Sequence, residues 1–202
     1  MLKLYAFPRS GNSREVKIVL HEKNIPFEII NTHAPDFNKE DAEFRKASPQ
    51  GKVPAIIDGA VYMSEAFHIN QYLEEKYPQP ALMPTGEAEK TAIRDWVNLY
   101  DKKLVLKIGL LVIECLLKTK EQQSEETKQR LRSEICAALA DLDARVVDRE
   151  YLFGDYSLAD IAVTPHIAAL PILGVQAPSD LKKFAEWFER IKARPSFKLS
   201  AA

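Results

Sequence analysis

Residues 51–57, "GKVPAII", read as a β-strand that has a proline at its entrance. Pro54 has no N–H to donate to a sheet, and its ring fixes its own φ. One interpretation is structural, since proline is tolerated at the first residue of a strand or on a sheet edge. In the other, a cis Val53–Pro54 bond turns the backbone of Val53 outward, so that its N–H and C=O pair with a ligand. The rest of the sequence has to distinguish between them.

Around this stretch, strand-like and helix-like patterns alternate up to about residue 77. A helical pattern separates two strand-like runs near the N-terminus, and a turn at Gly59 joins two more runs into a hairpin. A closing helix follows, with Ser64 as its candidate N-cap. These patterns predict an α/β domain over residues 1–77. The segments are, in order, "LKLYAF", "SREVKIVLHEKN", "PFEII", "NKEDAEFRKAS", "PAIID", "AVYM" and "SEAFHINQYLEEKYP".

A stretch punctuated by proline and glycine, "PQPALMPTG" at residues 78–86, separates this part from the rest of the chain. Beyond it every periodic segment is helical, and no strand pattern returns. We therefore predict a linker over 78–86 and an all-helical bundle over 87–202. Ser157 and Asp160 have the spacing of a capping box, which predicts a structural helix start. The expected helices span residues 87–118, 124–147, 157–170 and 180–193.

The composition excludes several classes of protein. The chain has 202 residues, of which 46% are hydrophobic, and this is enough for a sizeable core. Lys and Arg number 28 against 29 Asp and Glu, so there is no overall basic field for nucleic acid or an anionic membrane. Cys115 and Cys136 lack metal-ligand spacing and are expected to be reduced, buried thiols of a cytoplasmic protein. The apolar runs are too short for a signal peptide or a membrane span, and no metal site is expected.

The loop "FPRSGNSREV" collects hydroxyl groups and backbone N–H groups at the start of the first expected helix. The positive end of a helix dipole is a place to stabilise a small anion. Alternatively, Ser13 or Asn12 is only the N-cap, whereas Ser10 lies upstream of the expected cap. No His or Asp lies nearby to act as a base, so a serine hydrolase is not supported.

Glu65 begins the closing helix of the α/β domain. A carboxylate there commonly complements the helix dipole, but it also offers a partner for an amine. A free backbone edge at Val53, an acidic group at Glu65 and a hydroxyl at a helix N-terminus together favour a peptide-like ligand with an anionic atom.

The order of four motifs resembles the cytosolic glutathione transferases over essentially the whole chain. The motifs are "SGNSREVKIVLHEKNIPFE", "SPQGKVPAI", "SEAFHINQYLEEKYP" and "YLFGDYSLADIAV". The pattern Ser-x-x-Ser-x-x-Val is similar to the serine-type classes such as zeta, theta and tau. The resemblance implies a thioredoxin-like N-terminal domain followed by an all-helical C-terminal domain. It also implies a homodimer that uses glutathione as co-substrate.

In this resemblance each site residue takes the role of the family residue that it matches. Ser10 matches the serine that activates the glutathione thiol, Val53 the backbone partner of the cysteinyl group, and Pro54 the cis-proline. Glu65 faces the γ-glutamyl amine. Lys39 and Lys52 are implied contacts of the ligand's carboxylates. One position departs from the family pattern, because Ala66 replaces the usual serine and leaves the γ-glutamyl carboxylate with a backbone N–H alone.

The resemblance implies a detoxification enzyme in which the Ser10 hydroxyl donates to the thiolate of glutathione. The thiolate then attacks a small, mostly apolar electrophile, in a conjugation, an isomerisation or a peroxide reduction. The electrophile is expected between the two domains. The side chains expected to line that pocket are Phe7, Arg9, Trp96, Tyr100 and Leu104.

Two rival functions are compatible with parts of the sequence. A thiol-disulfide or dehydroascorbate-type reductase of the same superfamily needs a cysteine where Ser10 stands, and neither cysteine lies in that domain. A catalytically silent relative, similar to the stringent-starvation regulators that associate with RNA polymerase, is the second rival. "PALMPTG" and "LPILGV" resemble that group, and Ala66 leans towards it, whereas Ser10 favours the enzyme.

Overall fold

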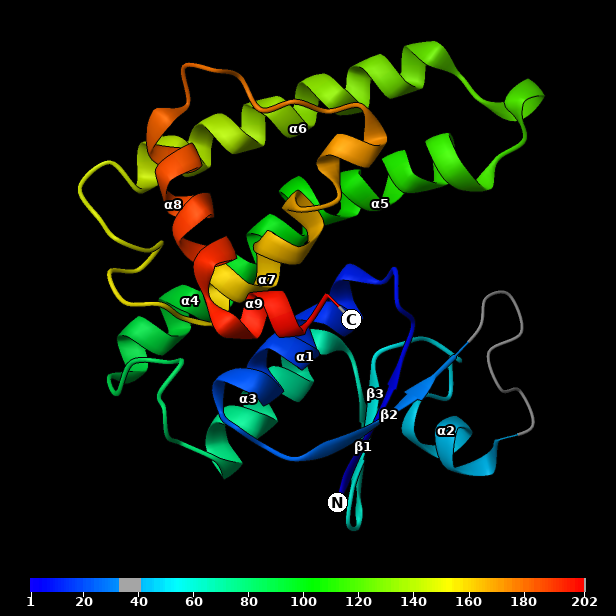
Figure 1. Ribbon diagram of the computed structural model, residues 1–202, viewed down its shortest axis with the longest axis vertical. Helices are drawn as coiled ribbons and strands as arrows, with labels where there is room; N and C mark the ends of the chain where they lie inside the picture. The colour runs from blue at the N-terminus through cyan, green and yellow to red at the C-terminus, as the bar shows by residue number, and fades with distance from the viewer. Residues whose placement is uncertain (33–40, 202) are drawn as a thin grey trace. The chain divides into compact units, whose positions relative to one another are not determined.

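The computed structural model describes residues 1–32 and 41–201, which form two compact units. The first unit comprises Met1–Met83 together with the C-terminal residues from Ala193, and the second comprises Pro84–Lys192. Its first unit contains a sheet with helices, which confirms the predicted α/β class (Figure 1). The elements of the first unit are β1 (Leu2–Ala6), α1 (Gly11–Glu22), β2 (Phe27–Asn31), α2 (Ala42–Ala47), β3 (Ala55–Asp58), β4 (Val61–Ser64), α3 (Ala66–Lys76) and α9 (Pro195–Leu199).

The sheet has four strands in the order β2-β1-β3-β4. β1 pairs with β2 in parallel, as the βαβ pattern requires, and β3 is antiparallel to both β1 and β4. The central position of β1 explains why "LKLYA" is almost entirely apolar, since a central strand is covered on both faces. Gly59, with φ of 62°, supplies the left-handed turn that joins β3 to β4.

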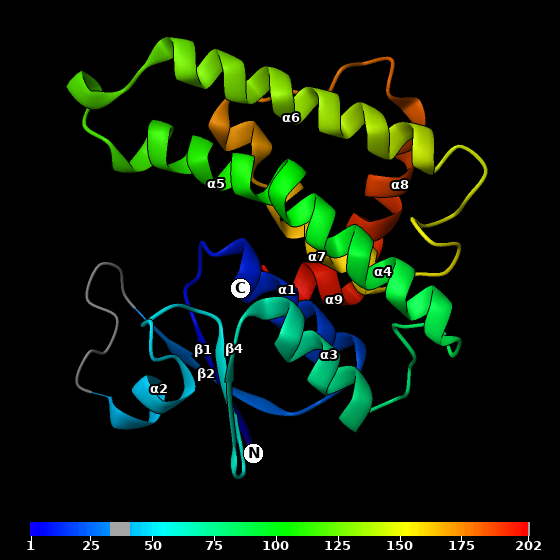
Figure 2. The same cartoon turned by 180° about the vertical axis from the view of Figure 1, so that it is seen from behind.

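Helices cover both faces of this sheet. Helices α1 and α3 pack together on one face, and α2 lies on the other (Figures 1 and 2). Tyr5, Ala55 and Ile57 form a buried cluster with Phe44 of α2. The Tyr5 hydroxyl donates to Asp41 Oδ2 at 3.1 Å, so this tyrosine is a packing residue.

A buried ion pair fastens the predicted linker to the first unit. Lys23 Nζ lies 2.6 Å from Glu74 Oε2 and also donates to the carbonyl oxygens of Tyr77 and Pro80. Glu74 in turn accepts from Leu82 N at 3.0 Å. Because each buried charge has a full set of partners, the chain after α3 is held in one path.

The second unit is helical, apart from short bridges between Tyr151 and Gly154 and between Phe153 and Asp155. This confirms the predicted all-helical part. The expected helix at 87–118 is present over 87–117, with two π-helical segments that side-chain periodicity did not predict. The elements are α4 (Glu87–Tyr100), η1 (Asp101–Val105), α5 (Leu106–Val112), η2 (Ile113–Leu117), η3 (Lys120–Gln122), α6 (Glu125–Arg145), α7 (Leu158–Ile167), η4 (Leu170–Leu173) and α8 (Lys182–Ala193).

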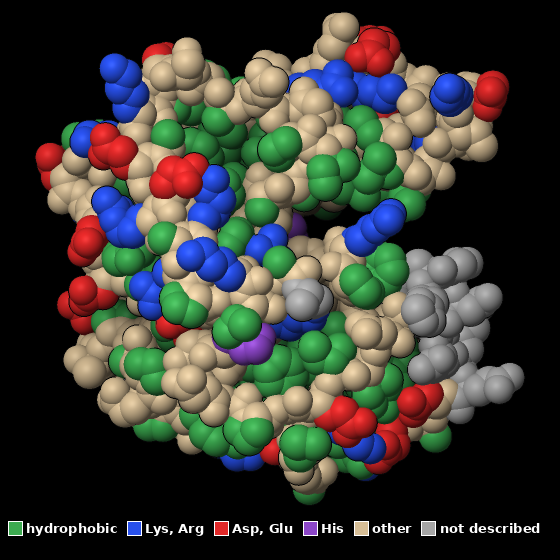
Figure 3. All heavy atoms as spheres, viewed as in Figure 1, with side chains coloured by type: hydrophobic (Ala, Val, Ile, Leu, Met, Phe, Trp, Pro, Cys, Tyr) green, Lys and Arg blue, Asp and Glu red, His purple; other side chains and the backbone are tan. Residues whose placement is uncertain are grey.

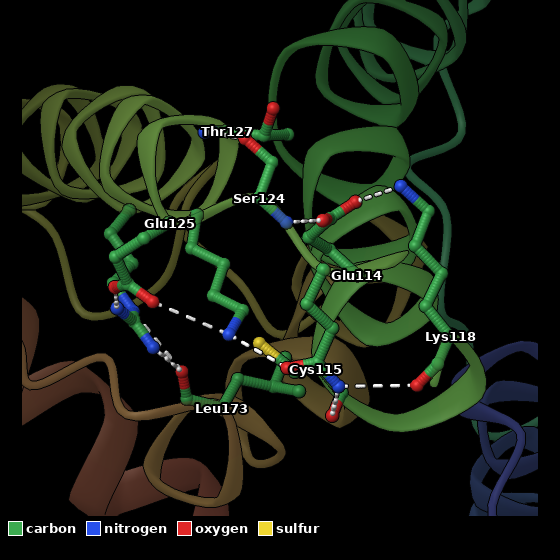
Figure 4. A network of polar contacts seen from close by, with 10 residues as sticks. Glu114, Cys115, Lys118, Ser124, Glu125, Thr127 and Leu173 are labelled. Atoms are coloured by element: carbon green, nitrogen blue, oxygen red, sulfur yellow. Dashed lines mark hydrogen bonds and ion pairs between the residues drawn. The ribbon is translucent and has the colours of Figure 1, made fainter. Parts of the chain in front are cut away.

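Polar contacts stabilise the turn between η2 and α6 (Figure 4). Glu114 accepts from Lys118 Nζ at 2.5 Å and from the backbone N–H of Ser124, whose hydroxyl caps α6. Cys115 lies beside this network as a free thiol. Each contact completes a helix end, which indicates a structural role.

Charges of both signs are interspersed over the face seen in Figure 3, in keeping with the formal net charge of −1. Among residues 1–32 and 41–201, no helix has the length and apolar character needed to span a membrane.

Candidate functional site

The strand register brings three loops to one end of the sheet. Tyr5 near the end of β1 pairs with Ala55 at the start of β3, and Ala55 pairs with Ser64 at the end of β4. Adjacent strands lie about 4.8 Å apart. The loop after β1, the loop before β3 and the connection after β4 therefore begin within about 10 Å of one another. The loop that leads to Ser10, the Val53–Pro54 dipeptide and the start of α3 therefore meet at this end.

Ser10 is itself the N-cap of α1, which corrects the expectation that Asn12 or Ser13 takes this role. Its backbone is extended, with φ of −85° and ψ of 118°, and its Oγ accepts from Ser13 N at 3.2 Å. A hydroxyl that accepts this bond keeps its own hydrogen for another acceptor. The side chain is half-buried, so the hydroxyl is within reach of a ligand.

Ser13 stabilises the loop between β1 and α1 with a hydrogen bond to its buried side chain. It is fully buried, and its Oγ accepts from Phe7 N at 3.3 Å, while Ser10 N donates to Phe7 O at 2.9 Å. These bonds close the loop between β1 and α1. A fully buried hydroxyl that accepts from the backbone has a structural position, whereas Asn12 is exposed.

The N-terminus of α1 keeps its positive end open to a ligand. The first turn of α1 contains no acidic residue, so no side chain of that turn neutralises the dipole. Backbone N–H groups at such an end attract anions. This geometry suits an anionic sulfur or oxygen beside Ser10.

A short turn over residues 48–52 positions Val53 at this end of the sheet. Gly51 adopts φ of 69°, Gly51 N donates to Ser48 O, and Ser48 Oγ accepts from Lys52 N, each at 2.9 Å. The Val53–Pro54 peptide bond is cis. Val53 is half-buried and lies just before the ladder, which begins at Ala55.

Glu65 is the N-cap of α3, and Ser64 is the last residue of β4, so the candidate cap at Ser64 was one residue early. Glu65 has φ of 75° and ψ of 115°, a conformation that is costly for a residue with a side chain. Its side chain is exposed and makes no capping hydrogen bond. Ala66 follows as the first helical residue, so its N–H is one of the donors at the helix start.

The other predicted site residues of this unit differ in exposure, and one of them lies outside the described residues. Lys52 and Arg9 are exposed, Phe7 is half-buried, and Lys39 lies outside the described residues. Arg14, which the sequence analysis did not single out, occupies the first turn of α1 and contacts residues near the C-terminus. Its partners lie more than 180 positions away, so no local pattern indicates this role.

The predicted pocket residues of the second unit are largely buried. Trp96 and Tyr100 stack with ring centroids 4.1 Å apart, and both line an open pocket of about 570 Å³. Lys103, Asp141 and Arg145 give this pocket a charged rim. Burial raises the pKa of Tyr100 to about 12, and Asp141 adds to the shift, so the phenol stays neutral.

Leu104 is fully buried in the second unit. The same long helix exposes other apolar side chains at a spacing of three and four residues. They are Leu106, Leu110, Ile113 and Leu117, with exposed fractions of 54, 43, 44 and 73%.

The side chains that most often bind metal ions are not clustered in the part of the chain that the structure describes. Within residues 1–32 and 41–201 no three His, Cys, Asp or Glu side chains are grouped so as to hold a metal ion. Cys115 and Cys136 are free, but both are half-buried and not fully buried as expected. Partial burial raises the pKa of Cys136.

Family models match most of the chain. The model of the glutathione S-transferase N-terminal domain matches residues 4–81, and that of the C-terminal domain matches residues 106–195. The zeta-class glutathione S-transferase of Euphorbia esula is 31% identical over 83% of this chain and 75% of that relative.

Other relatives match to different extents. Glutathione S-transferase Z2 of Arabidopsis thaliana is 39% identical over 42% of this chain, a match that spans only 38% of that relative's length. A stringent starvation protein A homologue of Coxiella burnetii is 27% identical over 99% of this chain and 91% of the relative. A solved glutathione transferase from Burkholderia graminis, described with two glutathione molecules bound per subunit, has a TM-score of 0.84 and 27% identity. That match covers 99% of this chain and 87% of the other.

Proposed function

The chain belongs to the glutathione S-transferase family, and from this membership we propose that it activates the thiol of glutathione through the hydroxyl of Ser10. The thiolate then attacks a small, mostly apolar electrophile. In the first step the thiol proton leaves to solvent. In the second the sulfur electron pair forms the new bond while a leaving group such as halide departs with its bonding electrons. In an addition, the π electron pair of the electrophile takes up a proton from solvent instead.

The observation that carries this proposal is the geometry of Ser10. Its oxygen accepts the capping bond from Ser13 N, which leaves its O–H hydrogen available to a different partner, because a hydroxyl accepts and donates in separate directions. The half-buried position at the open end of α1 adds the helix dipole to this donor.

The magnitudes are sufficient for the chemistry. A free thiol has a pKa of about 8.5, and lowering it by about two units requires roughly 2.7 kcal/mol of preferential stabilisation of the thiolate. One hydrogen bond to a charged group contributes about 1.5–3 kcal/mol, and a helix N-terminus adds about 0.3–1 kcal/mol. Ser10 and α1 together therefore supply the required amount, with Ser10 as a donor and not as the nucleophile.

Other residues hold the peptide part of the ligand in this proposal. The backbone of Val53 pairs with the cysteinyl group, and Glu65 faces the γ-glutamyl amine. The N–H of Ala66 meets the γ-glutamyl carboxylate, and Lys52 and Lys39 approach the carboxylates. The Glu65 side chain is exposed and makes no capping hydrogen bond to α3. Its carboxylate is therefore available to a ligand, which supports this assignment.

We extend the proposal to the electrophile and the assembly. Trp96 and Tyr100, which line the open pocket of the helical unit, remain its proposed contacts to an apolar electrophile, whereas Leu104 is packed inside. The family resemblance supports a cytoplasmic homodimer. Light scattering at several protein concentrations measures the oligomeric state directly.

The test is a titration of bound glutathione followed by the ultraviolet absorbance of its thiolate. We expect a thiol pKa about two units below that of free glutathione in the wild type. In Ser10→Ala only the helix dipole remains, so the pKa should be lowered by less than about one unit. Ser10→Thr keeps the hydroxyl and should retain the shift. Ser10→Asp keeps a capping acceptor but has no proton to donate at neutral pH, so it should lose the shift while α1 stays capped.

A second cap serves as the control for stability. Ser124→Ala removes the hydroxyl that caps α6 and should cost about 1 kcal/mol of unfolding free energy without altering the thiol pKa. Bound glutathione with an unshifted pKa in the wild type would overturn the assignment of Ser10. Failure of the wild type to bind glutathione at all would remove the transferase proposal and favour the partner-binding function.

A further inference from the structure

The C-terminal residues 193–201, called the C-terminal segment below, pack against helix α1. Helix α9 lies beside α1 in both ribbon views (Figures 1 and 2). Two side chains of α1, Arg14 and Glu22, make polar contacts to this segment within the part of the chain that the structure describes. Arg14 is near the start of the helix and Glu22 is its last residue.

Arg14 makes three contacts with the C-terminal segment. Its Nη2 donates to Phe197 O at 3.0 Å, and its Nε donates to Ser200 Oγ at 3.1 Å. The guanidinium also lies over the Phe197 ring, with Cζ 4.0 Å from the centroid. Phe197 and Ser200 are buried, so Arg14 is held by three partners in fixed positions.

The backbone of Arg14 is bonded directly to Ser10. Arg14 N donates to Ser10 O at 3.0 Å, which is the first i to i−4 hydrogen bond of α1. The same turn is also held by the bond from Phe7 N to Ser13 Oγ. The first turn of α1 is therefore bonded both to Phe7, the residue after strand β1, and to the C-terminal segment.

From these contacts we infer that Arg14 is a positioning residue, through which the C-terminal segment fixes the direction of the Ser10 hydroxyl. Helix ends fray unless side chains hold them. A hydrogen bond weakens as its geometry departs from linearity, so fraying of this turn reduces the stabilisation of a thiolate at Ser10. The inference rests on the proposed function for its effect on the thiol, but not for its effect on the helix.

The far end of α1 provides a matched control. Arg194 Nε and Nη2 donate to the two carboxylate oxygens of Glu22, each at 2.8 Å. This pair also joins α1 to the C-terminal segment, but Glu22 lies eight residues beyond Arg14, or about 12 Å along the helix. Arg194→Met therefore removes an arginine of similar surroundings without touching the first turn.

The experiment compares Arg14→Met with Arg194→Met in the full chain. We expect Arg14→Met to raise the pKa of the bound glutathione thiol by about one unit while the dissociation constant of glutathione changes less than about threefold. Arg194→Met should lower the melting temperature to a similar extent and leave the thiol pKa unchanged. Phe197→Leu removes the stacked ring but keeps the carbonyl acceptor, and it serves as the milder variant if Arg14→Met does not fold.

Hydrogen exchange gives a readout that needs no ligand. The amides of Ser13 and Arg14 should exchange faster in Arg14→Met than in the wild type, and at the wild-type rate in Arg194→Met. Equal effects of the two variants on exchange at these amides, or no effect of either, would overturn the positioning role. If the wild type bound no glutathione, the proposed function would fail, and the exchange rates would still decide the role of Arg14.

Discussion

In the proposed function a single hydroxyl at Ser10 combines a structural and a chemical task. As the N-cap of α1 it accepts from Ser13 N, and as a donor it has a hydrogen for a ligand. Ser124 caps α6 in the same way, with Oγ accepting from Thr127 N at 3.2 Å, but it lies in the second unit beside Glu114. The difference between the two serines is their surroundings and not their local bonding.

Glu65 has a backbone conformation that its residue type disfavours. At φ of 75° a side chain costs about 1–3 kcal/mol relative to a relaxed conformation, and glycine avoids most of this cost. We therefore expect Glu65→Gly to raise the unfolding free energy by about 1 kcal/mol and to weaken glutathione binding about tenfold, since the carboxylate is lost. Urea denaturation and calorimetric titration measure the two effects.

Glu65→Ala is the matched control, because it removes the carboxylate but keeps the Cβ atom and the strain. It should bind glutathione as weakly as Glu65→Gly without any gain in stability. Equal stabilities for the two variants would show that the positive φ carries no measurable cost.

At this scale the sequence identified residue types better than exact positions. Ser10 was singled out because it lies upstream of the expected cap, and Glu65 because a carboxylate at a helix start also offers a partner for an amine, and the family resemblance then implied their roles. The caps were assigned two or three residues late in α1 and one residue early in α3, since an N-cap is defined by its backbone dihedral angles. Side-chain periodicity begins only inside a helix, so it does not determine the backbone dihedral angles of the residue that caps it.

At the scale of the element, helix α7 begins with a fully satisfied buried carboxylate. Asp160 Oδ2 accepts from Ser157 N at 3.0 Å and Ser157 Oγ at 3.2 Å, while Oδ1 accepts from Leu152 N at 3.0 Å and Trp187 Nε1 at 2.9 Å. The capping box predicted from Ser157 and Asp160 is present, and it also ties α7 to α8.

Asp160→Asn should be more damaging than loss of the cap alone. The amide presents a donor to one of the two pairs of N–H and O–H groups, so buried donors lose their acceptor, and we expect a loss of about 3 kcal/mol. Ser157→Ala removes only the hydroxyl and should cost about 1 kcal/mol. Chemical denaturation distinguishes the two, and an Asp160→Asn variant no less stable than Ser157→Ala would contradict the network's importance.

Most helices and strands were predictable because their periods are local. The π-helical segments η1 and η2 were not, since they leave the apolar pattern of residues 87–117 helical overall. They change which side chains are inside, and this affects the candidate pocket. Leu104 lies in η1 and is fully buried, although its position on the helix had indicated a pocket wall.

At the scale of the whole molecule, the C-terminal segment is the feature that no local pattern indicates. Sequence analysis assigned all residues after 86 to the helical part, whereas the structure groups the residues from Ala193 with the first unit. The contact between Glu22 and Arg194 joins positions 172 apart. Periodicity and turn residues report on neighbours in sequence, so such a pairing needs the folded structure.

The same pair gives the first unit a specific dependence on pH. Burial alone raises the pKa of Glu22, but hydrogen bonds from Arg194 and Ser196 and the charge of Arg194 together hold the pKa below its ordinary value. A carboxyl group with a depressed folded-state pKa stabilises the fold at pH values above its unfolded pKa, about 4.3. That contribution is lost as the pH falls through the lower, folded-state value.

Glu22→Gln should therefore destabilise the protein by about 1 kcal/mol near neutral pH, and the difference from the wild type should shrink as the pH falls below about 4. Urea denaturation of both proteins across this range measures the difference. Glu43→Gln is the matched control, because the pair of Glu43 with Lys3, 2.7 Å apart, is exposed and contributes little. A Glu22→Gln difference that stays constant with pH would mean that the Glu22 carboxylate is not preferentially stabilised by Arg194 and Ser196.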